Sequence, residues 1–167
     1  MLLHTFFTDE TLQRCVRTVK DSAEQAGRDP SQVRLELLRG RRRLAPEDVR
    51  LKKTVGRLAT YLQAYGDLMV RTNGWDPDVL TRFRADPFVA GFRGALDGKA
   101  TTAELEHVAT LIPDEWLAPA ATGSPEQCAD AVRHQLISAP TPSSSTARRS
   151  AELAPVVDAY RARLATP

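Results

Sequence analysis

The pattern of apolar and polar residues over the first 35 positions predicts a strand, a helix and a second strand. Residues 1–7 form an apolar run typical of a buried strand, and Thr8 can cap a helix with an acidic first turn. The apolar residues of this helix recur every three or four positions: Leu12, Val16, Val19 and Ala23. Gly27 ends the helix, and residues 33–35 can begin another strand. A strand, a capped helix and a strand make one unit of an α/β fold.

A longer helical region begins at Pro46. The apolar side chains of its first helix are spaced by four and three residues: Leu51, Val55, Leu58, Leu62, Tyr65 and Met69. This spacing fits a coiled-coil seam, but it covers only about three heptads and therefore favours an ordinary packed helix. Asn73-Gly74 ends this helix.

Capping residues predict three further helices before residue 113. Asp76 precedes Pro77, Asp86 precedes Pro87, and Thr101 with Glu104 makes a capping box. The side chains expected to face inward are Val79, Leu80, Phe83, Phe88, Val89, Phe92, Leu105, Val108, Ala109 and Ile112. Trp75 and Trp116 stand beside helix starts, where we expect them to pack in the core or at its rim.

The stretch 111–133 contains the strongest helix start of the chain. Ser124 is a good N-cap, Pro125 suits the first helical position, and Gln127 completes a capping box. Asp114 and Glu115 are interpreted as acids at the start of a short helix rather than as a catalytic pair, because helix N-termini favour carboxylates.

Two segments, 36–45 and 136–150, break the pattern and are predicted to be irregular and mobile. The first is rich in arginine and is either a basic patch or, as we favour, a solvated loop. The second is a Ser/Pro/Thr-rich stretch with too few apolar residues to order itself. A last helix is predicted from Ser150, with apolar residues Leu153, Val157, Tyr160 and Leu164.

Composition and charge narrow the function classes. The 167 residues, 42% of them hydrophobic, fit one domain, and a net charge of +2 points to neither nucleic acid nor membrane. No apolar run is long enough to span a membrane, and residues 1–7 are too short for a signal peptide, so we expect a cytoplasmic protein. The two cysteines form no C-x-x-C, and the three histidines have no spacing suited to a metal site.

His4 and Thr5 are the candidate site residues, because they lie at the C-terminal end of the first predicted strand. In α/β barrels that edge carries the chemistry. A structural histidine is the alternative for His4. His107 lies one helical turn from Glu104, and we expect a surface pair between them.

Residues 2–10, 26–30, 51–86 and 111–133 resemble the C-terminal half of a luciferase-like monooxygenase, of the class that uses the deazaflavin coenzyme F420. The resemblance implies a TIM barrel with coenzyme (F420 or FMN) and a small organic substrate at the C-terminal ends of the strands. It also implies hydride transfer between coenzyme and substrate, and it places His4 and Thr5 in a coenzyme-binding loop. It assigns no catalytic residue. The chain departs from the family where its strands are expected, at 36–45 and 136–150, and it is shorter than the roughly 200–250 residues of a barrel.

We therefore expect a single partial domain, 1–167, that is mainly α-helical, with five or more helices and at most two or three short strands. As a fragment it should bind coenzyme poorly and self-associate through exposed apolar helix faces. The alternative function is a non-catalytic helical interaction module built on the seam from Leu51 to Met69.

Both irregular segments are compatible with paired frameshifts in the coding DNA. With GC-rich codons, a single-base shift over 136–149 lets the same bases encode Phe-Asp-Leu-Gly-Ala-Asp-Ser-Val-Ile-Leu-His, which has the apolar character of a buried parallel strand. A similar shift over 36–43 gives Trp-Ser-Cys-Phe-Ala-Ala-Val-Gly. The hypothesis predicts that two barrel strands have been replaced by polar or basic sequence.

Overall fold

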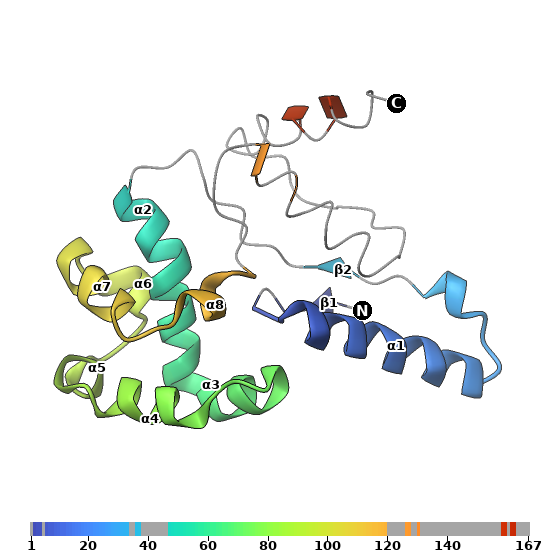
Figure 1. Cartoon of the computed structure of the whole chain (residues 1–167), viewed down its shortest axis with the longest axis horizontal. Coiled ribbons are helices and arrows are strands. Elements are labelled where there is room, and N and C mark those ends of the chain that lie inside the picture. Colours follow the sequence, from blue (N-terminus) through green and yellow to red (C-terminus); the bar gives the residue numbers. More distant parts are fainter. Residues whose placement is uncertain are drawn as a thin grey trace. The chain divides into compact units, whose positions relative to one another are not determined.

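The computed structural model describes residues 2–4, 6–33, 36–37 and 47–119, with short stretches between 126 and 130 and between 158 and 162. The chain divides into two compact units, one of residues 1–44 with 121–167 and one of residues 45–120 (Figure 1). The short C-terminal stretches are helical, as predicted for the last two helices, whereas Ser124, Ser150 and the segment 136–150 lie outside the described residues.

The first unit contains the predicted strand, helix and strand. Strand β1 (Leu2–Leu3) leads to helix α1 (Asp9–Gln25), a 3₁₀ turn (Pro30–Gln32) and strand β2 (Glu36–Leu37). The strands are parallel, with Leu2 opposite Glu36 and Leu3 opposite Leu37. The order β1, α1, β2 is therefore a parallel βαβ unit, the repeat from which α/β folds are built.

The position of β2 corrects one prediction. The sequence treated 36–45 as irregular, yet Glu36–Leu37 form a strand. The strand start predicted at 33–35 lies partly outside the described residues, and Val33 follows the 3₁₀ turn. Parallel pairing uses only backbone groups, so a glutamate in a weak local pattern can still join a ladder. Residues 34–35 and 38–46 lie outside the described residues.

Helix α1 begins and ends as its sequence predicts. The Thr8 hydroxyl accepts a hydrogen bond from the Thr11 backbone N–H at 3.3 Å, and Gly27 follows the helix with a left-handed φ of 68°. Leu12 and Val16 form the buried centre of this unit, and the partly buried side chains packed against them are Phe7, Cys15, Val19 and Val33.

The second unit is built on a long helical segment in three parts. Helix α2 (Glu47–Leu51) passes through a π-helical turn (Lys52–Gly56) into α3 (Arg57–Asn73). Five of the six predicted seam residues are buried: Leu51, Val55, Leu58, Leu62 and Met69. This confirms a packed helix. The sixth, Tyr65, is 37% exposed, because α3 kinks there with a non-helical backbone (φ −149°, ψ 36°).

Five short helices complete this unit: α4 (Pro77–Ala85), α5 (Pro87–Gly91), α6 (Leu96–Lys99), α7 (Thr102–Ala109) and α8 (Asp114–Leu117). The predicted caps are all present: Asp76 and Asp86 accept backbone N–H bonds, and Thr101 with Glu104 forms a capping box. Most of the residues predicted to face inward are buried, but Phe88, Phe92 and Ala109 are only partly buried. Phe88 and Phe92 belong to α5 and its end, and α5 is a single short turn.

Two glycines let helices approach closely in this unit. A Cβ on Gly56, at the end of the π turn, would lie 2.9 Å from the Asp97 Cα of α6. A Cβ on Gly66, just after the kink, would lie 2.7 Å from Leu80 Cδ1 of α4. The absence of side chains at these positions therefore sets how α4 and α6 pack on the long helix.

The described residues are mostly helical and contain two short strands, as expected. Within them, β1 and β2 form a two-stranded sheet. No helix in the described part of the chain is long and apolar enough to cross a membrane.

Candidate functional site

His4 lies directly after β1, where the sequence places the candidate site. Its Nδ1 accepts a hydrogen bond from the Phe6 backbone N–H at 3.3 Å, and its ring lies 6.0 and 5.8 Å from the rings of Phe6 and Phe7. The imidazole is partly buried. Thr5, the second predicted site residue, lies outside the described residues.

The surroundings of His4 favour its neutral form. Burial lowers the pKa of His4 below its ordinary value of 6.5, because desolvation disfavours the charged imidazolium. Since Nδ1 accepts a hydrogen bond, the neutral ring carries its proton on Nε2. At neutral pH the His4 ring therefore does not supply a positive charge.

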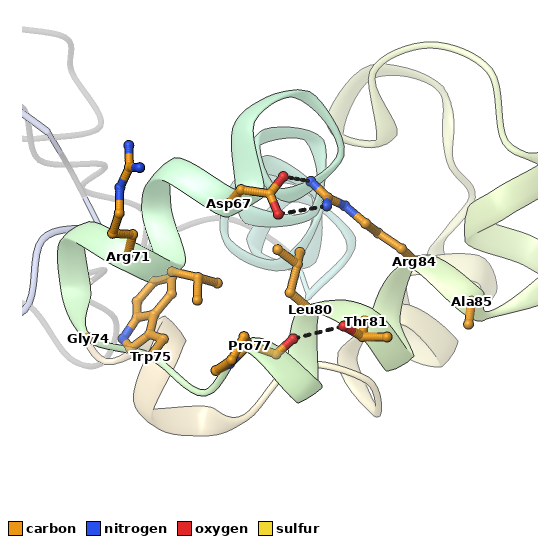
Figure 2. A pocket seen from close by; sticks show the side chains of 10 residues that line it. Asp67, Arg71, Gly74, Trp75, Pro77, Leu80, Thr81, Arg84 and Ala85 are labelled. Carbon is orange, nitrogen blue, oxygen red and sulfur yellow. Dashed lines mark hydrogen bonds and ion pairs between the residues drawn. The ribbon is translucent and has the colours of Figure 1, made fainter.

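The second unit carries a groove between two of its helices. It encloses about 790 Å³ between α3 and α4 (Figure 2). Its walls are mostly apolar, and the lining residues are Asp67, Val70, Arg71, Gly74, Trp75, Pro77, Leu80, Thr81, Arg84 and Ala85. The volume falls in the range of small-molecule sites, and sequence reasoning missed it, because its residues come from two separately predicted helices.

A bidentate ion pair closes one side of the groove. Arg84 Nη2 lies 2.8 Å from Asp67 Oδ2 and Nη1 lies 3.1 Å from Oδ1, as the dashed lines in Figure 2 show. Arg84 Nη2 also reaches the Leu62 carbonyl at 3.4 Å. The hydrogen bond from Arg84 holds the pKa of Asp67 below its ordinary value, so this carboxylate stays ionised and paired with Arg84.

Trp75 lines the groove and stacks on Trp116. The rings of Trp75 and Trp116 are stacked with centroids 4.3 Å apart and an angle of 9° between their planes. Trp116 is buried, whereas Trp75 is partly exposed and lines the groove. The prediction of core or rim packing is confirmed, with one tryptophan in each place.

A polar cluster ties the π turn and α3 to α6. Arg57 Nε lies 2.6 Å from Asp97 Oδ2, although without the direction of a hydrogen bond, and Thr60 Oγ1 lies 3.3 Å from Asp97 Oδ1. The Arg57 guanidinium also stands 5.9 Å from the centre of the Tyr61 ring. These contacts join neighbouring helices, which is a structural role.

The predicted pair between His107 and Glu104 is wrong. His107 Nε2 instead lies 3.0 Å from Asp86 Oδ2, and the Glu104 carboxylate accepts the Thr101 backbone N–H at 2.7 Å. The capping box uses Glu104 within its own helix, so His107 pairs with a carboxylate from the junction of α4 and α5. Asp86 in turn caps α5 by accepting the Phe88 and Val89 N–H groups at 3.0 and 3.1 Å.

Within the described ranges, no group of three or more His, Cys, Asp or Glu side chains could hold a metal ion. Among the described residues, His4 and the α3–α4 groove are the candidate sites that we consider, and they belong to different units. Comparison of the chain with protein-family models, with curated proteins and with solved structures found no match.

Proposed function

We propose that this chain is the C-terminal half of a luciferase-like oxidoreductase, a TIM-barrel enzyme that transfers a hydride between coenzyme F420 and a small organic substrate. The observation that carries the proposal is the parallel βαβ unit with His4 directly after its first strand. In parallel α/β folds, ligands bind at the C-terminal ends of the strands. The resemblance of the sequence to the luciferase-like family supplies the coenzyme and reaction class.

The state of His4 fits a flavin or deazaflavin coenzyme. These coenzymes present carbonyl and phosphate oxygens, and a neutral imidazole with its proton on Nε2 can donate to either. Thr5 is proposed as the second donor in the same loop. The coenzyme itself would supply hydride transfer, while the protein would bind and orient it.

A barrel requires eight strands, so the proposal also needs strands beyond β1 and β2. The present frame already forms the two-residue strand Glu36–Leu37, so the frameshift proposed at 36–45 concerns the residues that follow Leu37. We propose that restoring the reading frame over 36–45 and 136–150 recovers the two strands, and that the chain as given binds coenzyme weakly.

The nucleotide sequence of the gene, with its flanks, is the first test. We expect strand-like sequence in the alternative frame at both segments, joined in register to the flanking sequence. The frame-restored protein, with any coding sequence found upstream, is then titrated with F420 and with FMN by fluorescence. Saturable binding of one coenzyme supports the proposal and identifies that coenzyme. Alternative frames without a strand-like run, together with no binding by either protein, would overturn it.

Variants of His4 make the binding test specific. His4→Gln keeps a side-chain N–H donor and should retain most of the coenzyme affinity, whereas His4→Leu removes the donor and should weaken binding by about tenfold. His107→Gln is the control, because His107 pairs with Asp86 in the other unit. If the His4→Gln and His4→Leu variants bind the coenzyme with equal affinity, His4 does not donate a hydrogen bond to the coenzyme.

A non-catalytic helical interaction module is the second candidate. It is favoured by the compact unit of residues 45–120 and by Leu68, which α3 leaves 52% exposed. Sedimentation of the full chain tests this function. A stable dimer that the Leu68→Glu substitution dissociates would support it over the first function, provided that the frame-restored protein binds no coenzyme.

A further inference from the structure

We propose that the groove between α3 and α4 is a binding site for a small aromatic carboxylate. This site is separate from the coenzyme function proposed above, since every residue that lines the groove lies between Asp67 and Ala85. The size of the groove, the charge of its lining residues and the indole of Trp75 support this assignment.

The shape of the groove suits a small molecule. Its volume of about 790 Å³ lies within the range of about 300–1,000 Å³ that is common for ligand sites. The close approach of α4 to Gly66 and the bidentate pair of Arg84 with Asp67 fix the two walls relative to each other. A ligand would therefore meet a preformed surface.

The charges that line the groove select an anion. They are two arginines and one aspartate, and Arg84 is paired with Asp67. Arg71 is exposed at the rim, and no side-chain ion pair joins it to another of the residues that the structure describes. A carboxylate can bind Arg71 through two parallel N–H bonds without displacing an existing pair. A cationic ligand would have no unpaired carboxylate among the lining residues.

The indole of Trp75 selects a flat, apolar body. Trp116 stacks on one face of Trp75, so the groove is lined by the other face or the edge of that indole. Pro77 and Leu80 add apolar surface to the groove (Figure 2), and Val70 also lines it. An aromatic ring on Trp75 with a carboxylate directed to Arg71 would use both features, because both residues line the groove.

The chain has its own reporter for this site. It contains two tryptophans: Trp75 lines the groove, and Trp116 stacks on Trp75. Tryptophan fluorescence of the full chain, excited at the red edge of the indole band, is therefore recorded during titration with benzoate, benzamide and acetate. Benzamide has the shape of benzoate without its charge, and acetate has the charge without the ring.

We expect saturable quenching by benzoate, binding of benzamide that is weaker by about fivefold, and no saturation by acetate. Arg71→Gln should weaken benzoate binding by about fivefold and leave benzamide unchanged. Arg82→Gln is the matched control, because Arg82 is exposed on α4 and does not line the groove. Circular dichroism of both variants confirms that they are folded.

The proposal is overturned if benzoate gives no saturable signal, or if benzoate and benzamide bind equally. It is also overturned if Arg82→Gln weakens benzoate binding as much as Arg71→Gln does. Two-dimensional NMR of the indole N–H groups checks that the signal arises from binding, because both resonances should move with the same affinity as the fluorescence change. None of these measurements uses F420 or His4, so their failure would leave the coenzyme proposal standing.

Discussion

Gly56 offers a direct test of the packing around the π turn. The residue is fully surrounded, and a Cβ built on it would lie 2.9 Å from Asp97 Cα, 3.2 Å from Asp97 N and 3.2 Å from Leu105 Cδ2. Two of these three atoms belong to the backbone of α6, which cannot turn away as a flexible side chain can. Gly56→Ala therefore requires α6 to move away from the long helix.

The expected size of the effect follows from two opposing contributions. Alanine is favoured over glycine inside a helix by about 1 kcal/mol. Forcing an extra methyl group into a filled space costs about 1–3 kcal/mol. Because the nearest atoms are backbone, we take the upper part of that range and expect Gly56→Ala to lower the free energy of unfolding by about 1–2 kcal/mol.

Gly98→Ala is the matched control on the opposite side of the same contact. Gly98 lies in α6, next to Asp97, but a Cβ there would meet nothing within 4 Å. The substitution should therefore raise the free energy of unfolding by about 0.5–1 kcal/mol, since only the helix preference and the unfolded-state entropy change.

Urea unfolding of the full chain, followed by tryptophan fluorescence, measures both variants, because Trp75 and Trp116 lie in the same unit as Gly56. A Gly56→Ala chain as stable as Gly98→Ala, or more stable than the unchanged protein, would refute the close contact between the π turn and α6.

Three further predictions follow from the hydrogen bonds and burial. Asp86→Ala removes the acceptor for the Phe88 and Val89 N–H groups and should lower the free energy of unfolding by about 1–2 kcal/mol. Asp86→Asn keeps a capping oxygen and should lower it less. Equal losses of the two variants in urea unfolding would contradict the capping role. Leu62→Ala should cost about 2–5 kcal/mol without changing the sedimentation coefficient, whereas a change of oligomeric state at little cost would identify the seam as an intermolecular surface. NMR titration, with His4→Gln for assignment, should place the pKa of His4 below 6.5, and a midpoint at or above 6.5 would be inconsistent with its burial. Since the unfolded chain then binds the proton more readily, the first unit should lose stability as the pH falls below about 6.5.

Local features of the fold were predictable because they depend on neighbouring residues. The caps at Thr8, Asp76 and Asp86 need only a side-chain oxygen and a free backbone N–H two or three residues later. The buried seam of the long helix likewise follows from the spacing of its apolar residues.

Features that depend on distant residues were not predictable. The partner of His107 lies 21 positions away at Asp86, and the pattern around His107 offered only Glu104. The strand at Glu36–Leu37 is set by pairing with β1, not by its own composition. The groove combines Asp67 with Arg84 and Trp75 with Leu80, and no local pattern joins them. Of the candidate site, the sequence correctly placed His4 after a strand, while its protonation state depends on burial.

The π turn at Lys52–Gly56 also affects how this chain should be aligned with related sequences. A π-helical turn holds one residue more than an α-helical turn, so it is equivalent to a single-residue insertion that the helix absorbs without breaking. A related chain with a regular helix here should be one residue shorter between Leu51 and Arg57, with the same faces buried on either side. A gap of one position in that interval would therefore mark a change of helix type, and an alignment without it would assign residues on one side to the wrong face.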